Sequence, residues 1–214
     1  MITKDEIRNN LDIMFPHPLC ELNYTKDYEL LIATVLSAQS TDKSVNIATA
    51  VLFGKYNIFD LVNVPTKEIE NIIKKVGTYT KKALFIKEIS KSLVSEHNGV
   101  VPNDREYLES LPGVGRKTCN VVLSILFEEP TIAVDTHVSR VSVRLGLADA
   151  DDSLRVIEYK IGNTFPKKEW NRINLQLVLF GRYICKSIKP NCSECLFNNK
   201  CKIYNFDKEK ITSK

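Results

Sequence analysis

The segment Leu111-Pro112-Gly113-Val114-Gly115-Arg116-Lys117 lies between two stretches of helical periodicity, at residues 104–110 and 116–127. Two glycines spaced by one residue permit positive φ and keep side chains away from the backbone N–H groups at the start of the second helix. The segment therefore predicts a helix-hairpin-helix at about residues 104–127, whose turn can hold a phosphate without selecting a base sequence. A tight turn between two packed helices is the alternative, and it is the commoner origin of a lone GxG.

The rest of the chain shows the same helical periodicity. Apolar residues recur every three and four positions in almost every segment, and alternating strand-like runs are scarce. Thr66 and Gly77 are expected to start and end one helix, and Asn103 with Glu106 resembles a capping box for another. Six consecutive helices are expected at 26–39, 41–54, 67–76, 81–96, 104–110 and 116–127. The sequence therefore predicts an all-α protein.

Length and composition exclude several classes of protein. The chain has 214 residues, of which 43% are hydrophobic and 26% are charged, as in a globular protein of one or two domains. Residues 1–10 lack the apolar core of a signal peptide, and the apolar run 121–127 is far too short to span a bilayer. We therefore expect neither export nor a membrane segment.

The net charge of +4 is concentrated near the C-terminus. Residues 181–214 contain eight Lys or Arg and three Asp or Glu, a difference of +5. Such a basic segment favours either solubility or an electrostatic contact with phosphates, and charge alone does not decide between them.

Four of the six cysteines are clustered, whereas Cys20 and Cys119 stand apart. The cluster follows the spacing C-x6-C-x2-C-x5-C, through Cys185, Cys192, Cys195 and Cys201. Without an export signal, this pattern indicates metal ligation rather than disulfides. Structural zinc sites more often pair two short C-x2-4-C knuckles, and only one such pair is present, but zinc remains an alternative to an iron-sulfur cluster.

Lys117 is the first candidate for catalysis. It falls in the first turn of the second hairpin helix, where the helix dipole disfavours a protonated amine. The dipole and partial burial both lower a lysine pKa, which a nucleophilic lysine requires. The alternative is a lysine that binds phosphate as a point charge.

Asp135 is the second candidate. It follows the apolar run 132–134 and can cap a helix that continues through Arg144. A carboxylate fixed in this way can also stabilise positive charge that develops in a transition state.

In their order along the chain, these motifs resemble the endonuclease III family of helix-hairpin-helix DNA glycosylases. The resemblance runs almost from end to end, through residues 36–42, 97–99, the hairpin, residues 134–137 and the clustered cysteines. It implies a six-helix barrel domain, residues 22–131, packed on a helical domain made of residues 1–21 and 132–214. It also implies a [4Fe-4S] cluster held by the four cysteines in a loop at 185–201, and a cleft between the domains for DNA.

The resemblance also implies a role for each site residue. Lys117 attacks C1′ and forms a Schiff base, and Asp135 stabilises the positive charge on the sugar. Gln39 enters the gap left by the extruded base. The DNA backbone is held by the hairpin residues Leu111, Gly113, Gly115 and Arg116. The cysteine loop adds a basic surface from Lys186, Lys189, Lys200 and Lys202.

The expected function is that of a bifunctional DNA glycosylase and AP lyase of base excision repair, cytoplasmic and monomeric. Its substrate would be double-stranded DNA that contains oxidised pyrimidines or abasic sites. A monofunctional mismatch glycosylase of the same family is one alternative, and Lys117 argues against it. A non-catalytic DNA-binding module is another, against which Lys117 and Asp135 argue together.

One position departs from the family pattern. Thr78 follows Gly77, where similar proteins carry a larger apolar side chain that wedges into the opened base step. We therefore expect a weaker wedge, or one supplied by Tyr79, and Thr78 is not included among the site residues.

Overall fold

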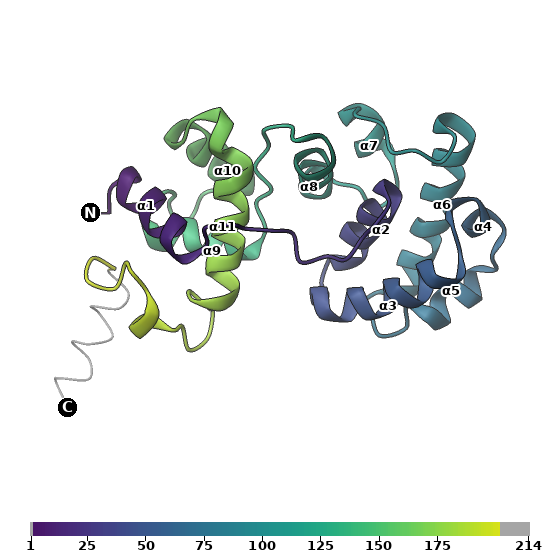
Figure 1. Ribbon diagram of the computed structural model, residues 1–214, viewed down its shortest axis with the longest axis horizontal. Helices are drawn as coiled ribbons and strands as arrows, with labels where there is room; N and C mark the ends of the chain where they lie inside the picture. The colour runs from purple at the N-terminus through teal and green to yellow at the C-terminus, as the bar shows by residue number, and fades with distance from the viewer. Residues whose placement is uncertain (1, 202–214) are drawn as a thin grey trace. The chain divides into compact units, whose positions relative to one another are not determined.

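The computed structural model describes residues 2–201, and all regular secondary structure in this range is helical (Figure 1). The all-α prediction is confirmed. The chain divides into two compact units, one formed by Cys20–Glu128 and the other by Met1–Leu19 with Glu129–Lys214. The domain limits expected from the sequence were 22–131 and the two flanking segments.

The unit Cys20–Glu128 contains the six helices expected from the sequence and one more. Its helices are α2 (Asp27–Ser37), α3 (Asp42–Lys55), α4 (Ile58–Asn63), α5 (Thr66–Ile72), α6 (Tyr79–His97), α7 (Arg105–Ser110) and α8 (Arg116–Phe127). The helix that periodicity did not predict is α4, which has only six residues. Its start is set by Asn57, whose side chain accepts hydrogen bonds from the backbone N–H groups of Phe59 and Asp60.

Helix α2 is the centre of this unit. Every residue from Tyr28 to Leu36 is buried, and α2 packs against α3, α6 and α8. A helix that is apolar on all sides must lie inside its domain, because no face of it is suited to water. Packing of α8 on α2 fixes the second helix of the hairpin in the core, through residues that include Val122 and Leu123.

Two helix boundaries differ from the sequence expectation. Helix α5 begins at Thr66, with Pro65 as its cap, and ends at Ile72 rather than near Gly77. Helix α7 is capped by Asp104, whose side chain accepts from the Tyr107 N–H at 3.1 Å, and not by Asn103. Asn and Asp cap helices about equally well, so the choice between neighbours is made by packing.

The second unit is discontinuous in sequence. It consists of α1 (Lys4–Met14), α9 (Thr136–Leu145), α10 (Leu154–Thr164) and α11 (Trp170–Tyr183), with short 3₁₀ turns η1 (Lys167–Glu169) and η2 (Cys192–Glu194). Helix α11 packs against both α9 and α1, and α10 packs against α9 (Figure 1). The N-terminal helix therefore shares a core with the C-terminal helices, through residues such as Leu11, Val141 and Phe180.

Within residues 2–201, no helix combines the length and the apolar character that crossing a membrane requires.

Candidate functional site

The predicted hairpin is formed by α7, α8 and the turn between them. Leu111 ends α7, its carbonyl accepts from the Val114 N–H at 3.1 Å, and Gly115 caps α8. The side chain of Leu111 is only 4% exposed and belongs to the core. Any contact of Leu111 with DNA is therefore restricted to its backbone.

Glycine occupies the two hairpin positions, 113 and 115, for different structural reasons. Gly113 has φ of +81°, and a Cβ there would lie 2.5 Å from a ring carbon of Phe85. Glycine is therefore required at position 113 by the fold itself. Gly115 has φ of −93°, and no atom lies within 4 Å of the place that its Cβ would occupy. The expectation of positive φ holds for Gly113 alone, and the absence of a side chain at Gly115 leaves room for a ligand.

The N-terminus of α8 has the properties of an anion site. No side chain caps this helix, and its first turn contains no acidic residue. Arg116 is exposed and Lys117 is half-buried in that same turn. A helix N-terminus binds anions through its backbone N–H groups and its dipole, and the two cations add to the attraction.

Gln39 lies in the same unit as Lys117, just after α2. Its side chain is exposed, and its backbone has the left-handed conformation, with φ of +55°. Residues other than glycine adopt this conformation at a cost, so the surrounding contacts must hold the turn in place.

Asp135 lies in the other unit and caps α9. Its carboxylate accepts from the backbone N–H of Val138 at 2.8 Å, and the residue is half-buried. The predicted capping role is therefore confirmed. One oxygen of the carboxylate, Oδ1, takes part in this cap.

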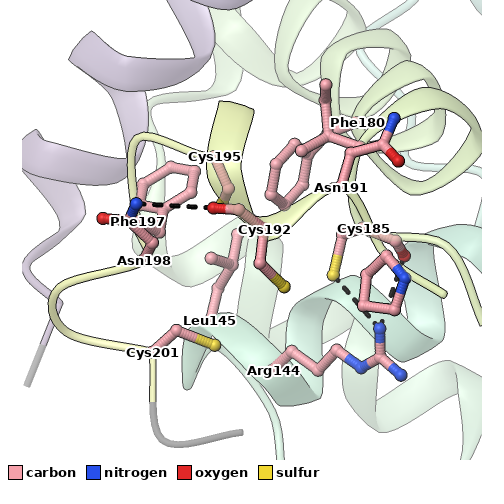
Figure 2. Close-up of a pocket in the computed structure, with 12 residues that line it drawn as sticks. Arg144, Leu145, Phe180, Cys185, Asn191, Cys192, Cys195, Phe197, Asn198 and Cys201 are labelled. Carbon is pink, nitrogen blue, oxygen red and sulfur yellow. Dashed lines mark hydrogen bonds between the residues drawn. The ribbon is translucent and has the colours of Figure 1, made fainter. Parts of the chain in front are cut away.

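The four clustered cysteines line one cavity (Figure 2). Its remaining wall is largely apolar and includes Leu145, Phe180 and Phe197. Figure 2 shows the thiols of Cys185, Cys192 and Cys201 facing the same region of the cavity, beside the Arg144 side chain. Among residues 2–201, no three His, Cys, Asp or Glu side chains are placed to hold one metal ion.

The cysteine loop is attached firmly to α9 and α11. Arg144 on α9 donates to Cys185 Sγ at 3.3 Å and to the Lys186 carbonyl at 2.8 Å. The Cys185 N–H donates to the Phe180 carbonyl of α11 at 2.7 Å. Phe197 is 3% exposed and meets Phe180 edge to face, with 5.4 Å between ring centroids. The loop therefore presents its thiols from a fixed backbone.

The basic surface expected on this loop is only partly formed by the described residues. Lys189 is exposed, but Lys200 forms an ion pair with Glu6 of α1. Its charge is therefore partly neutralised within the protein. Lys202 lies outside the described residues.

Comparison with known proteins identifies the family. Residues 32–167 match the HhH-GPD superfamily of base excision DNA repair proteins. The chain is 46% identical to endonuclease III of Bacillus subtilis over 190 residues, which are 88% of this chain and 87% of that protein. It is 42% identical to endonuclease III of Escherichia coli K12 over 207 residues, which are 96% of each chain. The chain belongs to the endonuclease III family.

Solved structures support the same assignment. A trapped covalent endonuclease III–DNA intermediate matches the chain with a TM-score of 0.91 and 45% identity, over 97% of this chain and 100% of that one. A non-covalent endonuclease III–DNA complex matches with a TM-score of 0.92 and 44% identity, over 98% and 100%. As a member of the endonuclease III family, the chain is a base excision repair enzyme, a DNA glycosylase with AP lyase activity.

Two residues that lie beside the candidate site residues were not predicted from the sequence. Arg144 contacts the cysteine loop, and no local pattern distinguishes it from other surface arginines. Lys82 is a buried lysine on α6, only 3% exposed. It shares a helical stripe with Ile86, Ile89 and Leu93, and a lysine in an apolar stripe is a signal that could have revealed it.

Proposed function

We propose that this glycosylase and AP lyase removes oxidised pyrimidines from duplex DNA and that Lys117 is its nucleophile. The observation that carries the proposal is the position of Lys117, half-buried in the first turn of a helix that no side chain caps. Lys117 belongs to the same helical turn as the backbone N–H groups suited to a phosphate, so a strand bound there lies close to this residue.

In the proposed reaction, the neutral amine of Lys117 attacks C1′ of the damaged nucleotide. The new N–C1′ bond replaces the glycosidic bond, whose electron pair leaves with the base. The attacking nitrogen gives up one proton, which balances the proton that the departing base takes up. Opening of the sugar ring produces a protonated Schiff base, which acidifies the C2′ proton. Loss of that proton breaks the C3′–O bond, so that the strand is cut on the 3′ side of the lesion. Water then releases Lys117.

Asp135 is proposed to stabilise the positive charge that builds on the sugar as the glycosidic bond breaks. The cap on α9 supports this role, because the bond to the Val138 N–H holds the carboxylate in one orientation. The carboxylate keeps further lone pairs with which it can face a sugar.

DNA is proposed to bind across the hairpin and the Gln39 turn. The backbone of Gly113 and Gly115 and the side chain of Arg116 contact phosphate, and the backbone of Leu111 supports the turn. Gln39 fills the gap that the extruded nucleotide leaves, at a cost of a few kcal/mol for unstacking. The solved endonuclease III–DNA complexes support duplex DNA as the partner.

We further propose that the four cysteines hold a [4Fe-4S] cluster. Four thiols around one largely apolar cavity suit this group, since thiolates are the ligands of iron-sulfur clusters. When bound, the cluster supplies a structural cross-link between the ends of the loop. Iron and zinc analysis of the purified protein tests the assignment: about four irons per chain are expected for a cluster, whereas zinc alone contradicts it.

The enzyme is proposed to act as a monomer in the cytoplasm, on chromosomal DNA. Sedimentation of the free protein and of its complex with a short duplex tests the oligomeric state. A stable dimer in both would contradict this part of the proposal.

Borohydride trapping tests the catalytic proposal. The protein is incubated with a duplex that contains one thymine glycol, reductant is added, and a covalent complex is sought. We expect a complex with the unchanged protein and with Lys91→Ala, an exposed lysine of α6, and none with Lys117→Ala. Duplex binding by Lys117→Ala is expected to persist, because the hairpin binds phosphate through its backbone.

Two outcomes would contradict the proposal. Release of free damaged base without a trapped complex would indicate a monofunctional glycosylase. Trapping that survives in Lys117→Ala would assign the nucleophile to another residue.

A further inference from the structure

Lys82 is a buried lysine whose ammonium donates hydrogen bonds to three residues at the end of α2 and just after it. Its Nζ donates to the carbonyl of Leu36 at 2.9 Å, to the carbonyl of Ala38, and to Ser40 Oγ at 3.4 Å. These oxygens belong to the C-terminal end of α2 and to the turn that follows it. The ammonium therefore has an acceptor for each of its three protons, one in the last turn of α2 and two in the turn that carries Gln39.

A second turn is joined to the first. The N–H of Gly77 donates to Ser40 Oγ at 3.0 Å, so this hydroxyl accepts from both Lys82 and Gly77. A Cβ on Gly77 would lie 2.8 Å from the carbonyl oxygen of Gln39. The turn at 77–78 and the turn at 38–40 are therefore in contact through their backbones.

Both turns contain an exposed residue with a strained backbone. Gln39 and Thr78 each have φ of +55°, and each side chain is exposed. The left-handed conformation is especially unfavourable for a β-branched residue such as threonine. Strain of this kind persists only where surrounding contacts enforce it, and it concentrates at functional sites.

Helix packing alone does not require an ammonium at position 82. Burial lowers the pKa of Lys82, because a charged ammonium loses its contact with water there. A methionine has a similar length and would fill the same space without a buried charge. The charge is therefore explained by its three acceptors, which are two carbonyl oxygens and one hydroxyl at the end of α2 and in the turn that follows, rather than by the core around α6.

We propose that Lys82 is a positioning residue for base extrusion, which holds the turns of Gln39 and Thr78 together as one preformed support. This inference rests on the proposed function, in which Gln39 occupies the gap left by the extruded nucleotide. Because the support already has its final shape, Gln39 can occupy the gap without the entropy cost of ordering two loops during the reaction. Lys82 thus acts through Gln39 and Thr78 and does not touch the reacting atoms.

The test compares two substrates under single-turnover conditions. In one, thymine glycol lies in a fully paired duplex. In the other, it lies opposite a mismatched thymine, where less base pairing must be broken. For Lys82→Met, we expect a loss of about tenfold or more on the paired substrate, because unstacking costs a few kcal/mol. On the second substrate we expect a change within about threefold, because the chemical step is unaffected.

Lys87→Met is the matched control. Lys87 lies on the same helix and also donates to a backbone carbonyl, that of Val64 at 2.7 Å, but in a different turn. We expect this variant to cut both substrates within about threefold of the unchanged enzyme. Equal losses on both substrates for Lys82→Met would overturn the inference, since a purely structural defect lowers both rates alike.

A second variant covers the case in which Lys82→Met does not fold. Gly77→Ala places a methyl group against the Gln39 carbonyl and separates the turns without changing any charge. It is expected to show the same selective loss on the paired substrate, and an unchanged rate on that substrate would overturn the inference. If the unchanged enzyme cuts neither substrate, the proposed function fails instead.

Discussion

At the scale of single residues, Gly113 and Gly115 show how the same amino acid serves two purposes in one turn. Gly113 is held by a positive φ and by the ring of Phe85, whereas the surroundings of Gly115 are open. A fold that does not need glycine at position 115 still has one there. The proposed phosphate contact explains it, because a side chain at the start of α8 would block the approach of DNA to the backbone.

The first prediction separates the two glycines. Gly115→Ala is expected to change the free energy of unfolding by less than about 1 kcal/mol, because its φ suits any residue and no atom opposes the methyl group. Its affinity for duplex DNA is expected to fall roughly tenfold, because charge-assisted bonds to phosphate are weakened. Denaturant unfolding and a binding titration at fixed salt measure the two effects.

Gly113→Ala is the comparison. It is expected to cost about 2 kcal/mol or more of stability, through backbone strain and the clash with Phe85. Unchanged DNA affinity in Gly115→Ala would show that phosphate does not approach that position.

At the scale of elements, Asp135 caps the N-terminus of α9. It is also the carboxylate that is proposed to stabilise the positive charge on the sugar. These roles can be separated because asparagine caps a helix about as well as aspartate does. An asparagine side chain retains the oxygen that the Val138 N–H needs, but it has no negative charge.

The second prediction is therefore that Asp135→Asn keeps its stability within about 0.5 kcal/mol, whereas Asp135→Ala loses about 1 kcal/mol. Both variants are expected to lose about a hundredfold or more in glycosylase rate, because a preorganised charge is removed from the transition state. Thermal unfolding and single-turnover base release measure these effects.

Asp104→Asn on α7 is the matched control, since Asp104 caps its helix through the same type of bond at 3.1 Å. This variant is expected to retain both stability and rate. Full activity in Asp135→Asn would limit Asp135 to capping.

At the scale of the whole molecule, each unit has its own core, and the cysteine loop completes the core of the discontinuous one. Phe197 is buried there, and Cys185 and Cys195 pack against the same core. A cluster that cross-links this loop would therefore stabilise the unit that carries Asp135.

The third prediction concerns that unit. Cys192→Ser is expected to contain little iron and to unfold at a temperature lower by about 5 °C or more, because metal binding contributes directly to folding free energy. Cys20→Ser, outside the cavity, is expected to retain its iron. Visible absorbance, iron analysis and thermal unfolding measure the comparison, and a Cys192→Ser protein with full iron would exclude Cys192 as a ligand.

The sequence by itself determined the helical class, the hairpin between residues 104 and 127, the Asp135 cap and the grouping of the four cysteines. Each of these depends on spacing within a short stretch of chain, where periodicity, turn residues and ligand intervals are visible directly. The same local information placed Lys117 in the first turn of its helix. The short helix α4 was not predicted because six residues are too few to show a period.

Only the tertiary structure decided which side chains at the sites are held by long-range contacts, and which partners hold them. It placed the side chain of Leu111 in the core, paired Lys200 with Glu6, and set Arg144 against Cys185. It also buried Lys82 and directed its ammonium to the carbonyls of Leu36 and Ala38, about forty residues away in sequence. These contacts join segments that are distant along the chain, so no local pattern could specify them.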